Sequence, residues 1–339
     1  MATIKDVAER AGVSKSSVSR VLNENFEYMS DQMKNKILKA MDELNYTPNS
    51  LAQSLKKKTT KTIGIILSDI SNPFWSGVLK GVQSECMRNE YELMVSSSSE
   101  DPSIEASNIL NLKNKQVDGM IINTAGKNLE LFDDLIKESY PFVFLDRLSE
   151  DLKADTVIVN NISGAKKSTE YLIDQGHKRI AILLYPLENR SPRIDRLEGY
   201  KQALKENNIP IDKDLIKICE HKSESGIKAT QEVLKLEDRA TAIFSTNTIL
   251  NLEVLTGTRK LGMKIPEDVS VFGYDDYPWV PLLDPPLSTV SQPAYEMGVK
   301  AITLLFMRME EKKERKPVIA QLEPELKIRS SCLPPKQLD

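Results

Sequence analysis

The chain has 339 residues and a formal net charge of −3, and 40% of its residues are hydrophobic while 28% are charged. This length exceeds the usual size of one domain, so we expect two or three compact units. We find no run near the roughly 18 consecutive apolar residues of a membrane span, and no apolar signal-peptide core at the N-terminus. These features predict a globular cytoplasmic protein without a membrane partner.

Cysteine and histidine usage narrows the chemistry further. The cysteines, Cys86, Cys219 and Cys332, are odd in number and far apart, and only two histidines, His177 and His221, are present. Such a set suits reduced core thiols and is poor material for a disulfide framework, a metal site or histidine-based catalysis. We therefore expect neither a metal nor a cofactor.

Charge is divided unevenly along the chain. Residues 1–62 contain 11 Lys or Arg and 7 Asp or Glu, whereas the remaining residues contain 35 and 42. A small basic segment ahead of a larger acidic body suggests that the front segment, and not the body, binds a polyanion.

The first 47 residues have the apolar spacing of three short helices. Gly12 interrupts the first run, and Ser14 and Ser30 are good N-cap residues for the second and third. The apolar positions are Ile4, Val7, Ala8 and Ala11, then Val18, Val21 and Leu22, then Met33, Ile37, Leu38, Met41 and Leu44. Two helices joined by a tight turn form a helix-turn-helix, whose second helix enters the major groove of DNA. The alternative is an ordinary small helical domain with a solvated polar face.

The second predicted helix begins with side chains suited to DNA. Lys15, Ser16 and Ser17 place hydrogen-bonding groups near its positively polarised N-terminus. Arg20 can make two hydrogen bonds to one guanine edge.

Residues 48–61 form a predicted linker. Pro48 ends the helical pattern, and three lysines precede the first strand. Residues 49–57 can form a short helix, but roughly eight residues are too few to stay helical alone in water.

From residue 62 onward, short apolar strands alternate with amphipathic helices. The predicted strands are 62–69, 91–98, 118–123, 141–146, 156–160, 179–185, 215–220, 242–247 and 269–274. The predicted helices include 74–89, 104–115, 163–175, 193–207, 225–236 and 249–261. This alternation indicates parallel, doubly wound sheets, and so many strands favour two lobes with a cleft between them. The predicted fold class is therefore α plus α/β.

A series of motifs extends from residue 3 to about residue 293. TIKDVAERAGVSKSSVSRVLN spans residues 3–23, and YTPNSLAQSLKKKTTKTIGIILSDISNPFW spans residues 46–75. QVDGMII, FVFLDR, GHKRIAIL, RLEGYKQAL, VSVFGYDD and LSTVSQP follow in that order. Together they resemble the LacI/GalR family of bacterial transcription regulators. The resemblance implies a helix-turn-helix domain (1–47), a hinge helix and linker (48–61), and a two-lobed, periplasmic-binding-protein-like body (62–339) for effector binding and dimerisation.

The resemblance also implies which residues of the head and hinge contact DNA. In the head they are Thr3, Lys15, Ser16, Ser17, Arg20 and Asn23, with Lys15 and Ser16 at the positions that choose the operator. In the hinge, which would be helical only when two subunits sit on DNA, they are Asn49, Ala52 and Leu55. Leu55 would insert into the minor groove and kink the duplex. The alternative is a flexible tether in which Leu55 packs on the body.

Polar and aromatic side chains follow the strand ends, where open α/β sheets bind ligands. The candidates are Asn72, Phe74, Trp75, Asp146, Arg147, Arg190, Arg193, Arg196, Asn247, Asp275 and Gln292. The resemblance implies that most of these positions line an effector cleft. Amides and aromatic faces suit the hydroxyls and apolar face of a sugar.

One departure from the family pattern concerns charge. Thr246 and Asn247 stand where the family usually has asparagine and aspartate, so a negative charge is lost. With four nearby arginines, this favours an anionic effector, because guanidinium groups bind carboxylate or phosphate through two hydrogen bonds. We expect a sugar acid such as a uronate or 2-keto-3-deoxygluconate, or a sugar phosphate. The alternative is a neutral sugar touched by Arg196 alone.

The sequence predicts a regulator and not an enzyme. Asp275 and Asp276 are adjacent and would point to opposite faces of a strand, and no nucleophile, phosphate loop or dinucleotide-binding motif accompanies them. The predicted protein is a homodimeric repressor of carbohydrate catabolism that binds a near-palindromic operator in double-stranded DNA. A regulator controlled by a protein partner, and less so a sugar-binding transport protein, remain the alternatives.

Overall fold

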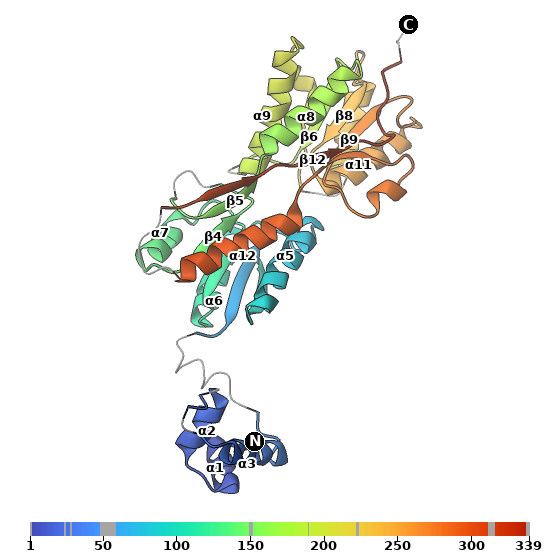
Figure 1. The fold of residues 1–339 in the computed structure, drawn as a ribbon. Coiled ribbons are helices and arrows are strands. Elements are labelled where there is room, and N and C mark those ends of the chain that lie inside the picture. The colour runs from blue at the N-terminus through green and yellow to red at the C-terminus, as the bar shows by residue number, and fades with distance from the viewer. Residues whose placement is uncertain are drawn as a thin grey trace. The chain divides into compact units, whose positions relative to one another are not determined.

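The computed structural model describes residues 2–23, 25–27, 29–47, 59–148, 152–188, 190–221, 224–310 and 316–336. It divides into two compact units, Met1–Lys61 and Thr62–Asp339, called here the head and the body (Figure 1). Among the described residues, no helix combines the length and apolar character needed to cross a bilayer. Within the same ranges, no cluster of three His, Cys, Asp or Glu side chains could hold a metal ion.

The head consists of α1 (Ile4–Ala11), α2 (Lys15–Leu22) and α3 (Asp31–Glu43). Gly12 has a φ of 64°, a conformation that glycine adopts without strain, and it ends α1 two residues before Ser14, which caps α2. The apolar face of each helix points inward. The shared core contains Val7, Ala8, Ala11, Val18, Val21, Ile37 and Ala40. The burial of these residues in one core confirms the predicted three-helix arrangement.

The first lobe of the body, called lobe 1, is built on a six-stranded parallel sheet in the order β11-β5-β4-β3-β1-β2. Its strands are β1 (Thr62–Leu67), β2 (Glu92–Ser97), β3 (Gly119–Ile122), β4 (Phe142–Leu145), β5 (Thr156–Val159) and β11 (Ile319–Leu322). Its helices are α5 (Phe74–Arg88), α6 (Pro102–Asn114), α7 (Leu129–Lys137) and α12 (Ala294–Glu310). Helices α5 and α12 cover one face and α6 and α7 the other, so the lobe is doubly wound.

The second lobe, called lobe 2, has a sheet in the order β12-β10-β9-β8-β6-β7, in which only β12 runs antiparallel to its neighbour. Its strands are β6 (Ile180–Leu184), β7 (Ile216–Ile218), β8 (Ala242–Ser245), β9 (Ser270–Tyr274), β10 (Ser288–Ser291) and β12 (Glu325–Lys327). Its helices are α8 (Asn161–Asp174), α9 (Ser191–Glu206), α10 (Ser225–Lys235) and α11 (Thr248–Lys260), with short 3₁₀ turns η1 (Lys213–Leu215) and η2 (Val280–Leu282). Helices α8 and α9 pack on one face of the sheet and α10 and α11 on the other.

The chain passes between the two lobes at three places. These crossings follow β5, β10 and β11, as the ribbon in Figure 1 shows. The strands β10, β11 and β12 lie beyond the last predicted strand and were not predicted. Each of them includes polar side chains. The nine predicted strands are all present, with ends within two residues of those expected. The prediction of two doubly wound, mainly parallel lobes is confirmed.

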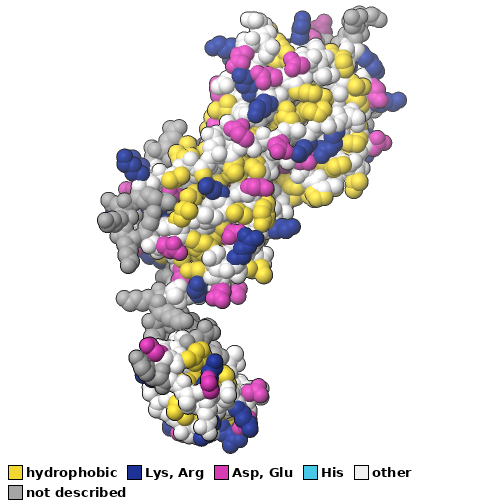
Figure 2. Space-filling model, in the orientation of Figure 1, with side chains coloured by type: hydrophobic (Ala, Val, Ile, Leu, Met, Phe, Trp, Pro, Cys, Tyr) yellow, Lys and Arg dark blue, Asp and Glu magenta, His cyan; other side chains and the backbone are white. Residues whose placement is uncertain are grey.

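On the face shown in Figure 2, basic and acidic side chains of the body are interspersed, and apolar side chains are exposed between them. Exposed apolar residues include Met87 on α5, Ile249 and Leu252 on α11, and Leu282 in η2, which is 83% exposed. The surface of the body is therefore neither uniformly basic nor free of apolar contact area.

Candidate functional site

Helix α2 carries four side chains predicted to contact DNA: three lie in its first turn, and Arg20 lies in its last turn. Lys15, Ser16 and Arg20 are exposed, and Ser17 is partly buried. The hydroxyl oxygen of Ser14 accepts the backbone N–H of Ser17 at 3.1 Å and lies 2.7 Å from the Ser16 hydroxyl and 2.9 Å from that of Ser17. The capped end of α2 thus presents a lysine and a cluster of hydroxyls, and the last turn of the helix adds the exposed Arg20.

Thr3 and Asn23, which were also predicted to lie near DNA, cap helices of the head. Thr3 Oγ1 donates to Oδ2 of Asp6 at 2.8 Å, and the backbone N–H of Thr3 donates to the same oxygen at 2.8 Å. Asn23 Nδ2 donates to the carbonyl oxygen of Ser19 at 2.6 Å. DNA contacts by these two side chains stay predictions. The predicted hinge residues lie outside the described residues: Asn49, Ala52 and Leu55.

A cavity of approximately 520 Å³ lies between the lobes of the body, beside the carboxyl ends of the strands. All of the side chains predicted for the effector cleft line it: Asn72, Phe74, Trp75, Asp146, Arg147, Arg190, Arg193, Arg196, Asn247, Asp275 and Gln292. The structure thus brings together residues from strands far apart in the sequence. Their roles in binding a ligand stay predictions. The lining also contains Ser68, Asp69, Ser99, Glu100, Tyr185, Pro192, His221 and Ile249, which the sequence analysis did not select.

Aromatic side chains contribute to the cavity wall from both lobes. Phe74 and Trp75 begin α5 in lobe 1, with their ring centroids 4.9 Å apart in an edge-to-face arrangement. Asn72 Oδ1 accepts the backbone N–H of Phe74 at 3.0 Å and so holds this turn. In lobe 2, Tyr185 stacks on His221 with a centroid distance of 4.1 Å. These rings offer apolar faces beside polar groups, as a sugar ring requires.

Arg196 is held in place by contacts within lobe 2. Its side chain is buried on α9, where Nε donates to Oδ1 of Asn161 at 2.8 Å and Nη1 donates to the carbonyl oxygen of Thr246 at 2.7 Å. Its guanidinium carbon lies 3.7 Å from the centre of the Tyr274 ring. These contacts fix the guanidinium group before any ligand binds.

Asp275 is the centre of a second polar group in the cavity wall, also on lobe 2. It accepts hydrogen bonds from Thr248 Oγ1 at 2.8 Å and from Gln292 Nε2 at 2.6 Å. Among the described residues, Oε1 of Gln292 is buried without a hydrogen-bond partner, which costs free energy that a ligand hydroxyl can offset. Asp276 forms an ion pair with Arg329 at 2.8 Å instead, so the adjacent carboxylates do not share a site.

Thr246 and Asn247 have structural partners at the end of β8. Thr246 Oγ1 donates to the carbonyl oxygen of Leu183 at 2.8 Å, within the sheet and outside the cavity lining. Asn247 Oδ1 accepts the backbone N–H of Ile249 at 2.9 Å and caps α11. Thr246 and Asn247 therefore hold the end of β8 and the start of α11 in place.

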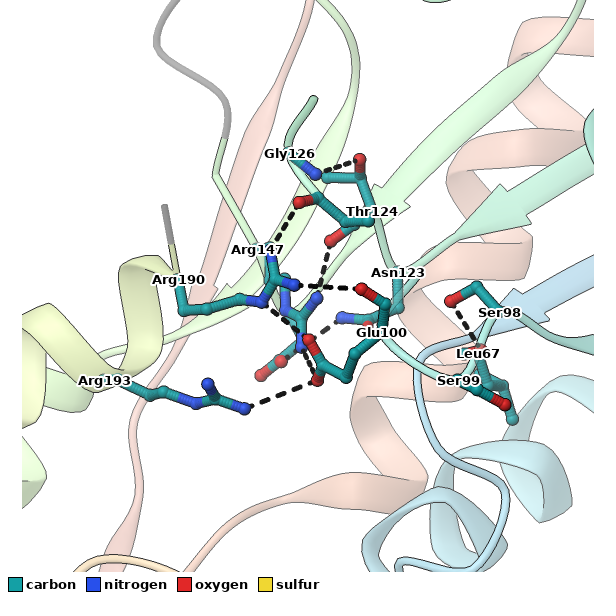
Figure 3. Close-up of polar contacts among 12 residues, drawn as sticks. Leu67, Ser98, Ser99, Glu100, Asn123, Thr124, Gly126, Arg147, Arg190 and Arg193 are labelled. Carbon is teal, nitrogen blue, oxygen red and sulfur yellow. Dashed lines mark hydrogen bonds and ion pairs between the residues drawn. The ribbon is translucent and has the colours of Figure 1, made fainter. Parts of the chain in front are cut away.

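Three of the predicted arginines converge on Glu100, as Figure 3 shows. The Glu100 carboxylate accepts from Nη2 of Arg147 at 2.5 Å, Nε of Arg190 at 2.6 Å and Nη2 of Arg193 at 3.4 Å. Glu100 and Arg147 belong to lobe 1, and the other two arginines to lobe 2. We call these four residues the arginine cluster.

Charge within the arginine cluster is only partly balanced. Burial alone raises the pKa of Glu100, but the three guanidinium groups outweigh it and lower that pKa to about 2. Burial also lowers the pKa of Arg193 to about 10, with the neighbouring guanidinium groups of Arg147 and Arg190 acting in the same direction. At neutral pH the cluster therefore contains three cations and one anion.

Backbone strain gathers at the same strand ends. Ser99, Glu100, Asp146 and Asp275 all have positive φ values, of 52°, 64°, 68° and 75°. Side chains other than glycine rarely adopt this conformation, and it concentrates at binding sites. Burial raises the pKa of Asp146, although Arg147 and Arg196 act in the opposite direction. The lining thus combines strained loops with carboxylates of contrasting pKa.

Glu100 is the main residue that the sequence analysis missed. Glu100 lies three residues beyond the end of β2, just after a run of serines. The same rule that selected Asp146 after β4 would have selected Glu100 after β2.

Comparison with known proteins gives the same picture as the fold. The family described as bacterial regulatory proteins of the lacI family matches residues 3–49, and the periplasmic binding protein-like domain matches residues 169–332. The chain is 35% identical to a probable HTH-type transcriptional regulator, EndR, of Paenibacillus polymyxa, over 98% of both chains.

Two solved structures extend the comparison to the whole fold. A lac repressor dimer bound to operator and the anti-inducer ONPF is 27% identical, with a TM-score of 0.87 over 98% of this chain and 99% of that one. A complex of the transcriptional regulator CelR with cellobiose is 28% identical, with a TM-score of 0.73 over 98% of this chain and 100% of that one. The family consists of regulators and not of enzymes. From this similarity over its full length, the chain belongs to the LacI family of DNA-binding transcriptional repressors with an effector-binding domain.

Proposed function

We propose that this repressor controls genes of carbohydrate catabolism and that a small, acidic, sugar-derived effector binds in the cavity between its lobes. The observation that carries the proposal is the arginine cluster, in which three guanidinium groups share one carboxylate. A second anion placed there would relieve the remaining repulsion among the cations. The aromatic rings and the buried oxygen of Gln292 support a hydroxyl-bearing ring beside it.

The proposed DNA contacts come from side chains along α2, from Lys15 at its start to Arg20 in its last turn. Lys15 and Ser16 would select the bases of one half-site, while Ser17 and Arg20 would contact bases or phosphates. Two heads would read a near-palindromic operator, because a two-fold protein dimer demands two-fold symmetry in the DNA. In the proposal, Leu55 of each hinge kinks the minor groove, and effector binding changes the hinge spacing. Such a protein works in the cytoplasm, where its operator lies.

The proposed assembly is a homodimer formed by the body. The lac repressor compared above is a dimer on its operator. Exposed apolar side chains on the body, Leu252 and Leu282 among them, provide contact area that a second subunit would bury. Sedimentation of the full-length protein at micromolar concentration tests this assembly.

Calorimetry with matched ligands tests the effector class. Glucose, glucuronate and glucose 6-phosphate share one ring and differ mainly at C6, and galactose with galacturonate gives a second matched set. 2-Keto-3-deoxygluconate covers an open sugar acid. We expect an acidic member to bind at least about tenfold more tightly than its neutral counterpart, which corresponds to about 1.4 kcal/mol. Tight binding of neutral sugars alone would contradict the acidic effector.

A second readout connects the cavity to DNA. Operator sites are first selected from random duplexes, and anisotropy then measures affinity with and without each ligand. A ligand that binds the body but leaves operator affinity unchanged would contradict its role as effector, because allostery requires a coupling free energy between the two sites.

A neutral sugar is the second candidate, and one observation favours it. The cavity lining contains four arginines and four carboxylates, namely Asp69, Glu100, Asp146 and Asp275, so its formal charges are equal in number. A ligand without charge would leave this balance intact. The matched ligand pairs separate the two candidates directly. If no sugar changes operator affinity but a cytosolic protein does, control by a protein partner is the better description.

A further inference from the structure

Glu100 lies at the centre of the arginine cluster, so a carboxylate of the chain itself already binds the three guanidinium groups. Its two carboxylate oxygens accept N–H groups from guanidinium groups of both lobes, as Figure 3 shows. Arg147 comes from lobe 1, and Arg190 and Arg193 come from the start of α9 in lobe 2. A carboxylate or phosphate of a ligand in the cavity would compete for the same donors, because all three arginines line it.

Each guanidinium group has a second anchor that does not depend on Glu100. Nη1 of Arg147 donates to the carbonyl oxygen of Thr124 at 2.7 Å, and Nη1 of Arg193 donates to that of Pro186 at 2.8 Å. Arg190 donates to the carbonyl oxygen of Ala125. The guanidinium groups would therefore keep their positions if Glu100 turned away.

The carbonyl groups that anchor Arg147 and Arg190 are themselves held in place by Glu105 on α6. The Glu105 carboxylate accepts the backbone N–H of Ala125 at 2.5 Å and the hydroxyl of Thr124 at 3.3 Å. Glu105 is fully buried. This contact holds the loop after β3, so its carbonyl oxygens stay available to the arginines.

The Glu100 side chain can move while its backbone stays in place. Its backbone N–H donates to the carbonyl oxygen of Ser68 at 3.0 Å, which ties the loop after β2 to the end of β1. The side chain is 26% exposed, so water can solvate the carboxylate when it leaves the arginines. The structure therefore combines donors that are anchored independently of Glu100 with a carboxylate that is partly accessible to water.

We propose that Glu100 is a specificity-determining residue that competes with the acidic group of a ligand for the guanidinium groups of Arg190 and Arg193. Ligands that bring a stronger or better placed anion displace it, and weak anions do not. Glu100 of lobe 1 contacts Arg190 of lobe 2. Displacing Glu100 would therefore replace this contact between the lobes by one that the ligand makes. This inference rests on the proposed function in placing the effector in the same cavity.

Titration with inorganic phosphate tests the competition without assuming a sugar. The full-length protein is compared with the E100Q variant, which keeps the shape of the side chain and removes its charge. We expect phosphate to bind E100Q at least about tenfold more tightly than wild type, because a charged competitor for the guanidinium groups has been removed. In the double variant E100Q/R190Q, most of this gain should be lost.

The matched control is D69N, which removes one negative charge from another part of the same cavity lining. Asp69 Oδ1 accepts hydrogen bonds from the backbone and hydroxyl of Ser71, and the amide can retain that acceptor. We expect phosphate affinity to change by less than about threefold, since the effect is then a longer-range Coulomb interaction. An equal gain in D69N and E100Q would reduce the role of Glu100 to general electrostatics and overturn the proposal.

Equal phosphate affinity in wild type and E100Q, or binding to neither, also overturns the proposal. If E100Q proves unfolded by circular dichroism, E100D replaces it. Its shorter carboxylate reaches fewer donors, so a smaller gain is expected, and no gain counts against the competition. The two experiments can fail independently. Tight binding of neutral sugars alone would contradict the acidic effector, whereas the phosphate comparison tests the role of Glu100 whatever the sugars show.

Discussion

The cations of the head and those of the body are held in opposite ways. Lys15 and Arg20 extend from one eight-residue helix into solvent. Arg147, Arg190 and Arg193 are instead bound by Glu100 and by backbone carbonyl oxygens of several loops. Solvated cations suit a polyanion that releases counterions on binding. Cations held in advance suit a small ligand, because little conformational entropy remains to be lost.

The largest expected effect comes from a substitution that unfolds the head and leaves the body folded. Ile37 is fully buried in the head core. Ile37→Ala should destabilise the head by roughly 2–5 kcal/mol and abolish operator binding, because a small domain has little stability to lose. Ligand binding to the body should be unchanged, as calorimetry can check. Leu38→Ala, at the neighbouring position that is 43% exposed, is the control and should have little effect; equal losses in the two variants would contradict this assignment of the core.

Removing one cation from α2 should weaken DNA binding without unfolding the head. For Arg20→Ala we expect a loss of about 1–3 kcal/mol per half-site in operator affinity, measured by anisotropy at fixed salt concentration. Arg10→Ala removes the same charge from α1, where Arg10 forms an ion pair with Glu43 at 2.5 Å. If Arg10→Ala weakens binding as much and relaxes the same base preference, the α2 surface is not the reading surface.

The arginine cluster should make the body sensitive to acid. Glu100 has a pKa of about 2 in the folded chain against 4.5 for an ordinary glutamate, so its ion pairs stabilise the body above about pH 4.5 and are lost as the pH falls toward 2. E100Q should unfold roughly 1–3 kcal/mol more easily than wild type at pH 6, with the difference shrinking below pH 4.5. Urea titrations across this range measure it, and a constant difference at all pH values would contradict the cause.

The smallest expected effect concerns Thr3, which caps α1 and was predicted to lie near DNA. Thr3→Ala should cost about 1 kcal/mol of head stability through loss of the cap. Thr3→Ser keeps the cap and serves as the control, because its hydroxyl can make the same hydrogen bonds to Asp6. If Thr3→Ala weakens operator binding far more than its thermal destabilisation explains, Thr3 contacts DNA in addition to capping the helix.

The sequence predicted the individual elements well because local patterns govern them. Apolar spacing located α1 to α3, and short apolar runs located β1 to β9. The strands β10, β11 and β12 were not predicted: β10 and β12 are mostly polar, and β11 pairs with β5, which lies far away in the chain. The two lobes are also discontinuous in sequence, which only strand pairing reveals.

The strand-end rule located much of the cavity lining but not the partners of its side chains. Arg196 and Asp275 could be placed from their positions after strands and at a helix start. That Glu100 gathers three guanidinium groups depends on the approach of loops after β2, β4 and β6, which no local pattern contains. The sequence by itself determined the helix-turn-helix, the alternation of strands and helices, and the family. Only the tertiary structure decided which charges meet, because Coulomb energies depend on distances between segments that the chain order leaves open.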